Sequence, residues 1–381
     1  MMRYPFFALF LFAAFFQGCK SPASRNEFDQ LFGRQSVSSI KYARLFDIYK
    51  KNGIKKVVIH SPFNDSTEAA VFYLIEKQQT GKYRHDPHIL PFPLTRVGVL
   101  SATQLNAVLQ LGLINQVAGI SDSRLLSSRE IKKRLRNGKL TEISQNGKLF
   151  VEKTLAVKPE AVFYSPYKNG QHLPVKGGIV EVPFFDFFEE NPLGRAEWIK
   201  LTAAFMGNEK KADSLFSAIE KSYLHFAETA KESTTKPTVF SGKYNNGQWF
   251  VPGGKSYLAH LFADAGANYI WKDNPSANSI ALDFEVVLQK AQKADFWRIL
   301  GGLNLEGDPY ENLLIENSLY QHFKAFKQER IIYCDPFETA YFEKSTLEPD
   351  MILKDFIKAF HPELLPGYEP VYYKLMKRSP E

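Results

Sequence analysis

The residues that could form a catalytic site do not assemble into a recognisable motif. The segment PGGKS at 252–256 ends like a phosphate-binding loop, but the leading glycine of such a loop would fall at Trp249. The segment GKSYL lacks the second glycine of the turn that presents a nucleophilic serine in many hydrolases. The eight histidines include no His-Glu-x-x-His pair that would bind zinc. We therefore expect a protein that is not an enzyme and has no resident cofactor or metal.

Two glutamates open segments that share a spacing. In each segment the glutamate is followed by Leu, Ala and Phe at offsets of three, nine and eleven: Glu152 with Leu155, Ala161 and Phe163, and Glu285 with Leu288, Ala294 and Phe296. A carboxylate in the first turn of a helix is stabilised by the helix dipole, so each glutamate alone could simply begin a helix. The repeated spacing indicates a duplicated unit in which a helix leads into a strand.

The first eighteen residues are typical of an export signal. Arg3 precedes an apolar run from Phe6 to Phe16 that is too short to span a bilayer easily. Gly18 stands directly before Cys19, as in a bacterial lipoprotein signal, which predicts cleavage there and lipidation of Cys19. A plain cleaved signal and an uncleaved anchor are the alternatives, and all three export the chain. Cys334 then has no disulfide partner, and we expect it to be buried in a strand.

The composition is that of a globular protein with a large core. The chain has 381 residues, of which 44% are hydrophobic and 14% aromatic, and its formal net charge is +7. The aromatic excess suits either core packing or a surface that binds a large flat ligand. Basic residues cluster only in REIKKRLRNGK at 129–139, which we interpret as a solvated helix face, with contact to an anionic ligand or lipid as the alternative. Export makes nucleic acid an unsuitable partner.

The hydrophobic pattern predicts the elements that carry these residues. A polar tether at 19–39 is followed at 40–95 by strand-like pieces, which we expect to form a small antiparallel sheet. Short apolar strands then alternate with helices, a pattern typical of parallel sheets covered on both faces. The alternation occurs twice, at 96–190 and at 236–365, and residues 366–381 are left as a tail.

Between the two alternating regions, residues 191–235 have helical spacing. Apolar residues recur at that spacing through 208–232, which predicts one helix of about 25 residues that is long enough to reach from one lobe to the other. The predicted fold class is α/β: two Rossmann-like lobes with parallel sheets, joined by a single long interlobe helix, plus a small N-terminal antiparallel β extension.

The order of these segments resembles a known family. The chain is similar, from about 96 to 365, to class III periplasmic solute-binding proteins of ABC transporters, which carry ferric siderophores, haem and cobalamin, and most of all to a lipoprotein branch of Bacteroidetes type. The resemblance rests on the order and spacing of several segments, among them RVGVLSATQLNAVLQLGLINQVAGIS, VEKTLAVKPEAVFYSP, WFVPGGKSYLAHLFADAGANYIW and LDFEVVLQKAQKADFW.

The resemblance implies roles for the two glutamates. In this family each lobe presents one surface glutamate to an arginine pocket on the membrane permease dimer, and Glu152 and Glu285 match both positions. A bidentate pair between arginine and carboxylate suits such docking. The implied partners are an ABC permease dimer with its cytoplasmic ATPase, and the membrane through the lipid anchor.

The ligand is expected between the lobes, at the carboxyl ends of the strands. Aromatic residues there suit stacking on a chelate, and basic residues suit its anionic groups. The predicted ligand-binding residues are Ser101, Thr103, Asp122, Arg124 and Tyr167 in the first lobe, and Lys243, Tyr244, Trp249, Phe250, Tyr341 and Phe342 in the second.

The expected function is capture of a metal chelate (a ferric siderophore, haem or cobalamin) and its delivery to the permease. Two alternatives stay open: an accessory lipoprotein that interacts with partners without transport, and an exported hydrolase. We expect a periplasmic protein anchored to a membrane, preferably the outer one, because CKSPAS lacks an aspartate after the cysteine.

Overall fold

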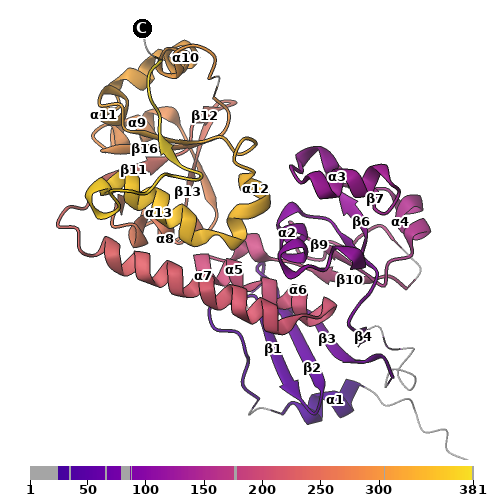
Figure 1. Cartoon of the computed structure of the whole chain (residues 1–381). Helices are drawn as coiled ribbons and strands as arrows, with labels where there is room; N and C mark the ends of the chain where they lie inside the picture. Colours follow the sequence, from indigo (N-terminus) through magenta and orange to yellow (C-terminus); the bar gives the residue numbers. More distant parts are fainter. Residues whose placement is uncertain are drawn as a thin grey trace, which may run out of the picture.

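The computed structural model describes residues 25–33, 36–64, 67–78, 86, 88–175, 178–303 and 305–379, which form two α/β lobes, a helical connection and an N-terminal sheet (Figure 1). The predicted export signal and Cys19 lie outside these residues. In the described part of the chain, no helix has the length and apolar character needed to cross a membrane.

The N-terminal lobe is built on a six-stranded sheet with the order β10-β9-β5-β6-β7-β8, parallel except for the last pair. Its strands are short and apolar, and β9 is buried along its whole length. The helix after β5 begins at the capping residue Ser101 and ends at Gly112, which has the positive φ of 77° that glycine adopts at helix ends. The elements are β5 Val97–Val99, α2 Ala102–Leu111, β6 Val117–Ser121, α3 Arg129–Arg136, β7 Thr141–Gln145, β8 Lys148–Leu149, α4 Val151–Val157, β9 Ala161–Tyr164 and β10 Val180–Pro183.

The C-terminal lobe contains a five-stranded sheet with the order β14-β11-β16-β17-β18, and a small antiparallel sheet, β12-β13-β15, follows β11. Cys334 lies in the fully buried strand β17, as predicted. The elements are β11 Thr238–Ser241, β12 Tyr244–Asn245, β13 Gln248–Pro252, α8 Tyr257–Asp264, β14 Asn268–Tyr269, β15 Ser279–Leu282, α9 Phe284–Ala291, β16 Phe296–Leu300, α10 Pro309–Glu316, α11 Lys324–Lys327, β17 Ile331–Cys334, α12 Tyr341–Lys344, α13 Pro349–Phe360 and β18 Lys374–Leu375.

The two lobes repeat one strand order. The order β6-β5-β9-β10 in the N-terminal lobe corresponds to β14-β11-β16-β17 in the C-terminal lobe, and the N-terminal sheet adds a further parallel strand, β7, outside β6. The α/β prediction and the duplication are therefore confirmed. After β5 or β11 the chain first adds a strand on one side (β6 or β14) and later adds one on the other side (β9 or β16). Ligands of α/β sheets bind outside the carboxyl ends of the strands where the strand order reverses in this way.

The N-terminal sheet differs from the prediction in one pairing. Strands β1 Phe46–Lys51, β2 Ile54–His60 and β3 Glu68–Glu76 are antiparallel, but β4 Ile89–Phe92 runs parallel to β3. Part of the expected tether is also folded: α1 Arg25–Leu31 covers this sheet, and Phe28 and Phe32 are buried against it. The spacing of these two aromatic residues, one helical turn apart in a polar segment, explains that packing.

Three consecutive helices connect the lobes: α5 Pro192–Glu197, α6 Ile199–Met206 and α7 Glu209–Ala230. The predicted long helix is present as α7, with 22 residues. Near its start, Asn208 donates a hydrogen bond to the carbonyl of Leu111 in the N-terminal lobe. Farther along, Tyr223 donates to Asp264 and Ser222 donates to Asp350, both in the C-terminal lobe. The connection is thus a set of helices in contact with both lobes instead of one helix alone.

Two buried carboxylates join this connection to the segment before β1. Glu197 accepts hydrogen bonds from the backbone N–H groups of residues 41–43, and Glu189 accepts them from residues 44 and 45. Lys200 also donates to Glu197 at 2.7 Å, and the indole N–H of Trp198 donates to Glu189 at 3.0 Å. Burial raises the pKa of the Glu189 carboxyl, although these donors oppose that shift. Each carboxylate is therefore held by several donors at once.

The C-terminal segment is part of the lobe and not a free tail. Strand β18 pairs with β17, and Tyr372 and Tyr373 are buried. The buried carboxylate of Asp355 accepts hydrogen bonds from the Tyr368 hydroxyl and from the N–H groups of residues 371–373. The sequence did not reveal this packing, because it depends on contacts between the segment and one buried carboxylate, Asp355, in the preceding helix.

Replacing Glu197 by glutamine should destabilise the fold. The substitution removes the charge that four donors share and places an amide N–H₂ among N–H groups, so we expect the free energy of unfolding to fall by about 2–4 kcal/mol. Urea denaturation followed by circular dichroism measures the change. Glu228→Gln, on the exposed face of α7, is the matched control and should change stability by less than about 0.5 kcal/mol. Equal effects of the two substitutions would contradict this assignment.

Candidate functional site

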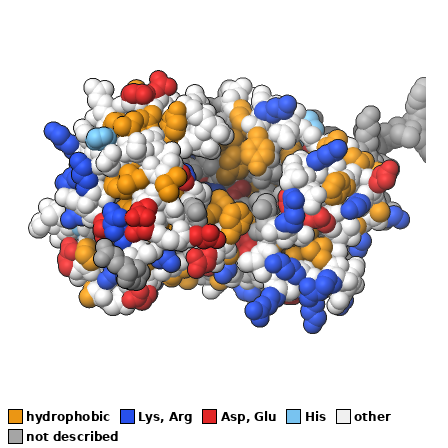
Figure 2. All heavy atoms as spheres, turned by 90° about the horizontal axis from the view of Figure 1, so that it is seen from above, with side chains coloured by type: hydrophobic (Ala, Val, Ile, Leu, Met, Phe, Trp, Pro, Cys, Tyr) orange, Lys and Arg blue, Asp and Glu red, His pale blue; other side chains and the backbone are white. Residues whose placement is uncertain are grey.

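The carboxyl ends of the strands in both lobes border the space between the lobes. Figure 2 shows this face of the molecule, with a hollow between its two halves and hydrophobic side chains on both sides of the hollow. Helix α12, which follows β17, reaches the N-terminal lobe, since Glu343 accepts hydrogen bonds from the backbone N–H and the hydroxyl of Ser127. This arrangement places the predicted ligand-binding loops of the two lobes around one cleft.

A cavity of about 440 Å³ lies on the N-terminal wall of the cleft. Its volume is within the range of small-molecule sites. It is lined by residues that follow the first three parallel strands, and four of the five predicted residues are among them: Ser101, Asp122, Arg124 and Tyr167. The fifth, Thr103, instead donates a hydrogen bond to the buried carboxylate of Asp186 at 3.0 Å. Four of the five residues predicted for this lobe therefore line one cavity.

The charged groups of this cavity form a local pair. Arg124 donates two hydrogen bonds of 2.9 Å to Asp122 and one of 2.7 Å to the side-chain oxygen of Asn146. The guanidinium of Arg124 holds the pKa of the Asp122 carboxyl below its usual range. More than half of the Arg124 side chain is exposed. The pair fixes the plane of the guanidinium and leaves it accessible from the cleft.

Exposed aromatic side chains gather at the carboxyl ends of the strands. Among the described residues, four aromatic side chains are more than half exposed: Tyr167 (73%), Phe250 (52%), Phe337 (70%) and Phe342 (51%). Tyr167 follows β9, Phe250 lies in the small sheet after β11, and the other two follow β17. Three of the four were predicted as ligand-binding residues, and Phe337 was missed because its Pro-Phe context resembled the end of a core strand.

Three other residues that were predicted to bind the ligand in the C-terminal lobe are buried or already paired. Trp249 is fully buried among aromatic rings, and its N–H donates to the carbonyl of Ser241 at 3.0 Å. Lys243 donates to the Glu316 carboxylate at 2.7 Å, so its charge is already neutralised. Tyr341 is 9% exposed. Alternation along a strand explains Trp249, because its neighbour Phe250 points to the opposite side of the sheet. Tyr244 is half-buried and packs edge-on against Phe284.

Two arginines near Tyr257, at the start of α8, were not predicted. Arg298 lies in β16, is 8% exposed, and donates to the hydroxyls of Ser241 and Tyr373. No carboxylate of the described residues forms an ion pair with it, and its Nε has no partner there. Arg195 of α5 lies over the ring of Tyr257 at 5.0 Å, and its Nε is also without a partner. For Arg298, the sequence did carry a signal: it is the single charged residue within the apolar strand FWRIL.

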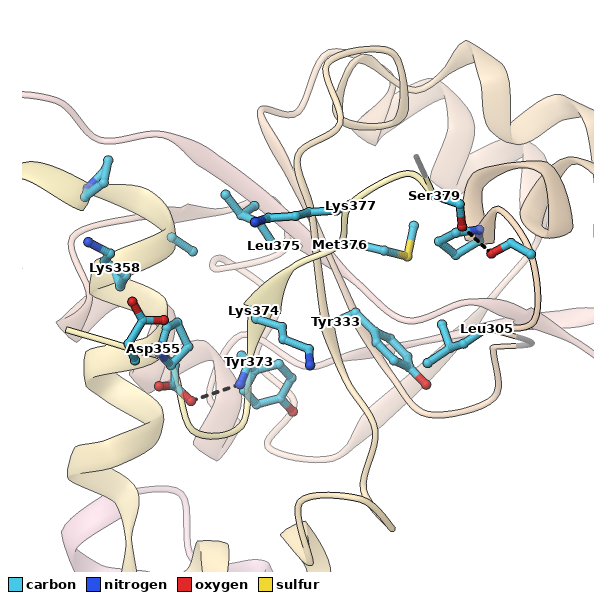
Figure 3. A pocket seen from close by; sticks show the side chains of 16 residues that line it. Leu305, Tyr333, Asp355, Lys358, Tyr373, Lys374, Leu375, Met376, Lys377 and Ser379 are labelled. Carbon is cyan, nitrogen blue, oxygen red and sulfur yellow. Dashed lines mark hydrogen bonds between the residues drawn. The ribbon is translucent and has the colours of Figure 1, made fainter. Parts of the chain in front are cut away.

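The larger cavity of about 700 Å³ lies elsewhere, beside β18 and α13 (Figure 3). Its lining includes Tyr333, Asp355 and Lys358, and the hydrogen bonds of Asp355 to the C-terminal segment already use that carboxylate. No group of three or more metal-binding side chains occurs in the part of the chain that the structure describes. Neither this cavity nor a cluster of metal-binding side chains in the described residues offers an alternative to the cleft as the ligand-binding site.

The two repeated glutamates occupy equivalent positions. Glu152 is the second residue of α4 and Glu285 is the second residue of α9, and both side chains are exposed. The described residues offer neither of them an ion pair. In each unit the residue two positions later, Thr154 or Val287, is fully buried and fixes the helix against its sheet. Each lobe therefore presents one carboxylate on a rigid helix end.

Comparisons with known proteins agree with this architecture. A family model described as periplasmic binding protein matches residues 97–337. An uncharacterized lipoprotein of Methanocaldococcus jannaschii is 28% identical over 297 residues, which cover 75% of this chain and 69% of that protein. A periplasmic binding protein from Veillonella parvula has a TM-score of 0.58 at 15% identity, over 82% of this chain and 99% of that one. The periplasmic haem-binding protein BhuT has a TM-score of 0.53 at 15% identity, over 71% and 98%.

Removing the contact between Ser127 and Glu343 should let the lobes separate. We expect Glu343→Ala to lengthen the distance between spin labels attached to cysteines at positions 148 and 293, one exposed position on each lobe, as measured by pulsed electron paramagnetic resonance. The labelled protein spans residues 20–381 and lacks Cys19. Cys334 should not be labelled, because burial raises the pKa of its thiol to about 11.

Glu338→Ala removes an exposed carboxylate from the loop before α12 and is the matched control. Ser127→Ala removes the hydroxyl donor but keeps the backbone N–H, so it should lengthen the distance less than Glu343→Ala does. Combining the two substitutions should add little to the effect of Glu343→Ala alone, because both residues belong to one interaction. An unchanged distance in Glu343→Ala would show that this contact does not hold the lobes together.

Proposed function

Because the chain belongs to the periplasmic binding protein family, and so is a solute-binding protein and not an enzyme, we propose that its solute is a metal chelate: a ferric siderophore, haem or cobalamin. The protein captures this chelate between its lobes and delivers it to an ABC permease dimer that is driven by a cytoplasmic ATPase.

The observation that carries this proposal is the position of the exposed aromatic rings. Of the four described aromatic side chains with more than half of their surface exposed, Tyr167, Phe337 and Phe342 follow the parallel strands β9 and β17, and Phe250 lies in the small sheet after β11. Exposed aromatic surface is costly in water and is stabilised when it stacks on a flat apolar group. A porphyrin, a corrin or an aromatic iron-binding group supplies such a face, whereas a small sugar or amino acid does not.

The buried arginine favours a ligand with anionic groups. Arg298 is held out of water with only hydroxyl partners, and an unpaired buried charge is costly unless a counter-ion completes the site. Helix α8 begins beside it at Tyr257, and the positive end of the helix dipole adds to the same potential. Carboxylate, catecholate or propionate groups of a chelate would satisfy both. Haem binding by BhuT, which has the same fold, is consistent with this ligand class.

The exposed carboxylates of Glu152 and Glu285 are the groups we assign to permease docking. Their equivalent positions on α4 and α9 offer one carboxylate from each lobe, which matches a dimeric partner with one basic pocket in each subunit. For the location, we propose a periplasmic protein that is lipidated on Cys19, as the lipoprotein name of its relative supports. The outer membrane is preferred over the inner one for the anchor.

A panel of chelates tests the ligand class. Cobalamin, haem and several ferric siderophores are titrated into residues 20–381 while tryptophan fluorescence is recorded, and we expect saturable quenching by at least one of them. Phe250→Ala with Phe337→Ala should then weaken its binding at least tenfold, because two stacking contacts of about 1 kcal/mol each are lost. Leu224→Ala with Ile315→Ala, which removes exposed apolar groups outside the cleft, should leave binding unchanged. Failure of every chelate to bind would overturn the proposal.

The contribution of the Arg298 charge to chelate binding is measured in the same fluorescence titration. Arg298→Gln should weaken binding tenfold or more, since hydrogen bonds to charged groups contribute about 1.5–3 kcal/mol. Arg330→Gln, an exposed arginine at the opposite edge of the sheet, is its control. Thermal unfolding of both variants separates loss of binding from loss of fold.

Docking is tested separately from ligand binding. Glu152→Ala combined with Glu285→Ala should abolish chelate uptake by cells while the chelate affinity of the purified protein stays within about twofold. Glu228→Ala with Asp213→Ala, on the exposed face of α7, removes the same charge and should leave uptake intact. Normal uptake by the first variant would exclude docking through these residues. Failure to recover any permease with the unaltered protein would instead favour an accessory lipoprotein.

A further inference from the structure

Helix α3, at the rim of the cleft, has a strongly basic outer face. Arg129, Lys132, Lys133 and Arg136 follow the i, i+3, i+4, i+7 spacing, and all four are exposed. On the opposite side, Ile131 is fully buried and fixes the helix to the lobe. We call these four exposed residues the basic stripe. Lys139, just beyond the helix, is also exposed.

The basic stripe has no acidic partners within the described residues. The one acidic residue of α3, Glu130, pairs with Arg134, which lies outside the stripe and also donates to Asn115. Like charges three and four positions apart destabilise a helix by a few tenths of a kcal/mol for each pair, and only those near the C-terminus are favoured by the dipole. The stripe therefore concentrates positive charge that the fold does not use.

The stripe lies on the part of the molecule that carries the cleft opening. Figure 1 places α3 and α4 on the part of the N-terminal lobe far from α7 and the N-terminal sheet. Figure 2, the view onto this face, shows Lys and Arg side chains gathered on the half that holds this lobe. Glu152, on α4, is the carboxylate that we propose for docking in the same lobe.

We propose that the basic stripe contacts anionic phospholipid headgroups of the membrane around the permease. This rests on the proposed docking through Glu152 and Glu285, which would bring this face to the membrane surface. Each Lys or Arg near an anionic surface contributes favourable binding energy, and a flat surface can contact all four side chains of one helix face together. The contact would add to the two carboxylate pairs and orient the cleft over the permease.

A role in attracting an anionic ligand is the competing interpretation, and the geometry favours lipid. The stripe points away from the body of the lobe, opposite to Ile131, while the cavity on the cleft wall is lined by the preceding residues, including Arg124 and Leu126. None of the four residues of the stripe lines that cavity. Long-range attraction of a ligand would change its association rate and would not produce binding to vesicles.

Co-sedimentation with lipid vesicles tests the proposal. The protein spans residues 20–381, which include all described residues, and lacks Cys19, so that a lipid anchor cannot contribute. We expect binding to vesicles of 70% phosphatidylcholine and 30% phosphatidylglycerol at 50 mM salt, loss of that binding at 500 mM salt, and no binding to pure phosphatidylcholine. Lys132→Gln, Lys133→Gln and Arg136→Gln together should weaken binding at least tenfold.

The matched control removes three positive charges from the other side of the molecule, by Lys210→Gln, Lys211→Gln and Lys221→Gln on exposed positions of α7. It should bind the vesicles like the unaltered protein. No binding to anionic vesicles, or an equal loss in both triple variants, would overturn the proposal, as would a stripe variant that changes only the association rate of the chelate. Chelate affinity, measured without vesicles, tests the proposed function independently of this result.

Discussion

Five consecutive backbone N–H groups, of residues 41–45, are held by two buried carboxylates, Glu189 and Glu197, and the arrangement of the molecule depends on this interaction. Without a carboxylate, that extended segment would leave its donors unpaired against the helical connection. With it, the N-terminal sheet is fixed to α5 and α6. Gly194 permits the close approach, because a side chain there would lie 2.8 Å from the carbonyl oxygen of Tyr42. The N-terminal sheet is thus held on the helical connection that contacts both lobes.

The repeated strand order decides where ligand groups can lie. In both sheets the first parallel strand lies between the strand that follows it and a later one, β5 between β6 and β9 and β11 between β14 and β16. The carboxyl ends of β5 and β9 and those of β11 and β16 are therefore the positions where an α/β sheet binds its ligand. In the N-terminal lobe these ends provide Ser101 and Tyr167, and in the C-terminal lobe they lie next to Arg298. The same duplication places Glu152 and Glu285 at equivalent helix starts, so one architectural repeat accounts both for the cleft and for the paired surface carboxylates.

The alternation of strands and helices, the long helix α7 and the N-terminal wall of the cleft could be predicted because each depends on local patterns of apolar and polar residues. Other features depend on which neighbour a side chain meets. Trp249 and Phe250 are adjacent aromatics, and only the strand register decides that the first is buried and the second exposed. Lys243 was predicted to be free for a ligand, but Glu316, 73 residues away, binds it. In the repeated units, Leu155 is 42% exposed and the buried position is one residue earlier, because the helix begins at Val151.

The balance of interactions at the cleft assigns different roles to its aromatic and charged groups. Burying the exposed remainder of four aromatic rings under a ligand would contribute about 1–1.5 kcal/mol for each ring, or roughly 4–6 kcal/mol in total. Micromolar affinity requires about 8 kcal/mol after the cost of association is met. The rings alone therefore hold a flat ligand weakly and with little discrimination. The remainder must come from charged groups, and Arg298 is suited to this because it is buried, rigidly held and without an anionic partner among the described residues. Under the proposed function, stacking would select the shape of the ligand and the buried guanidinium would select its charge.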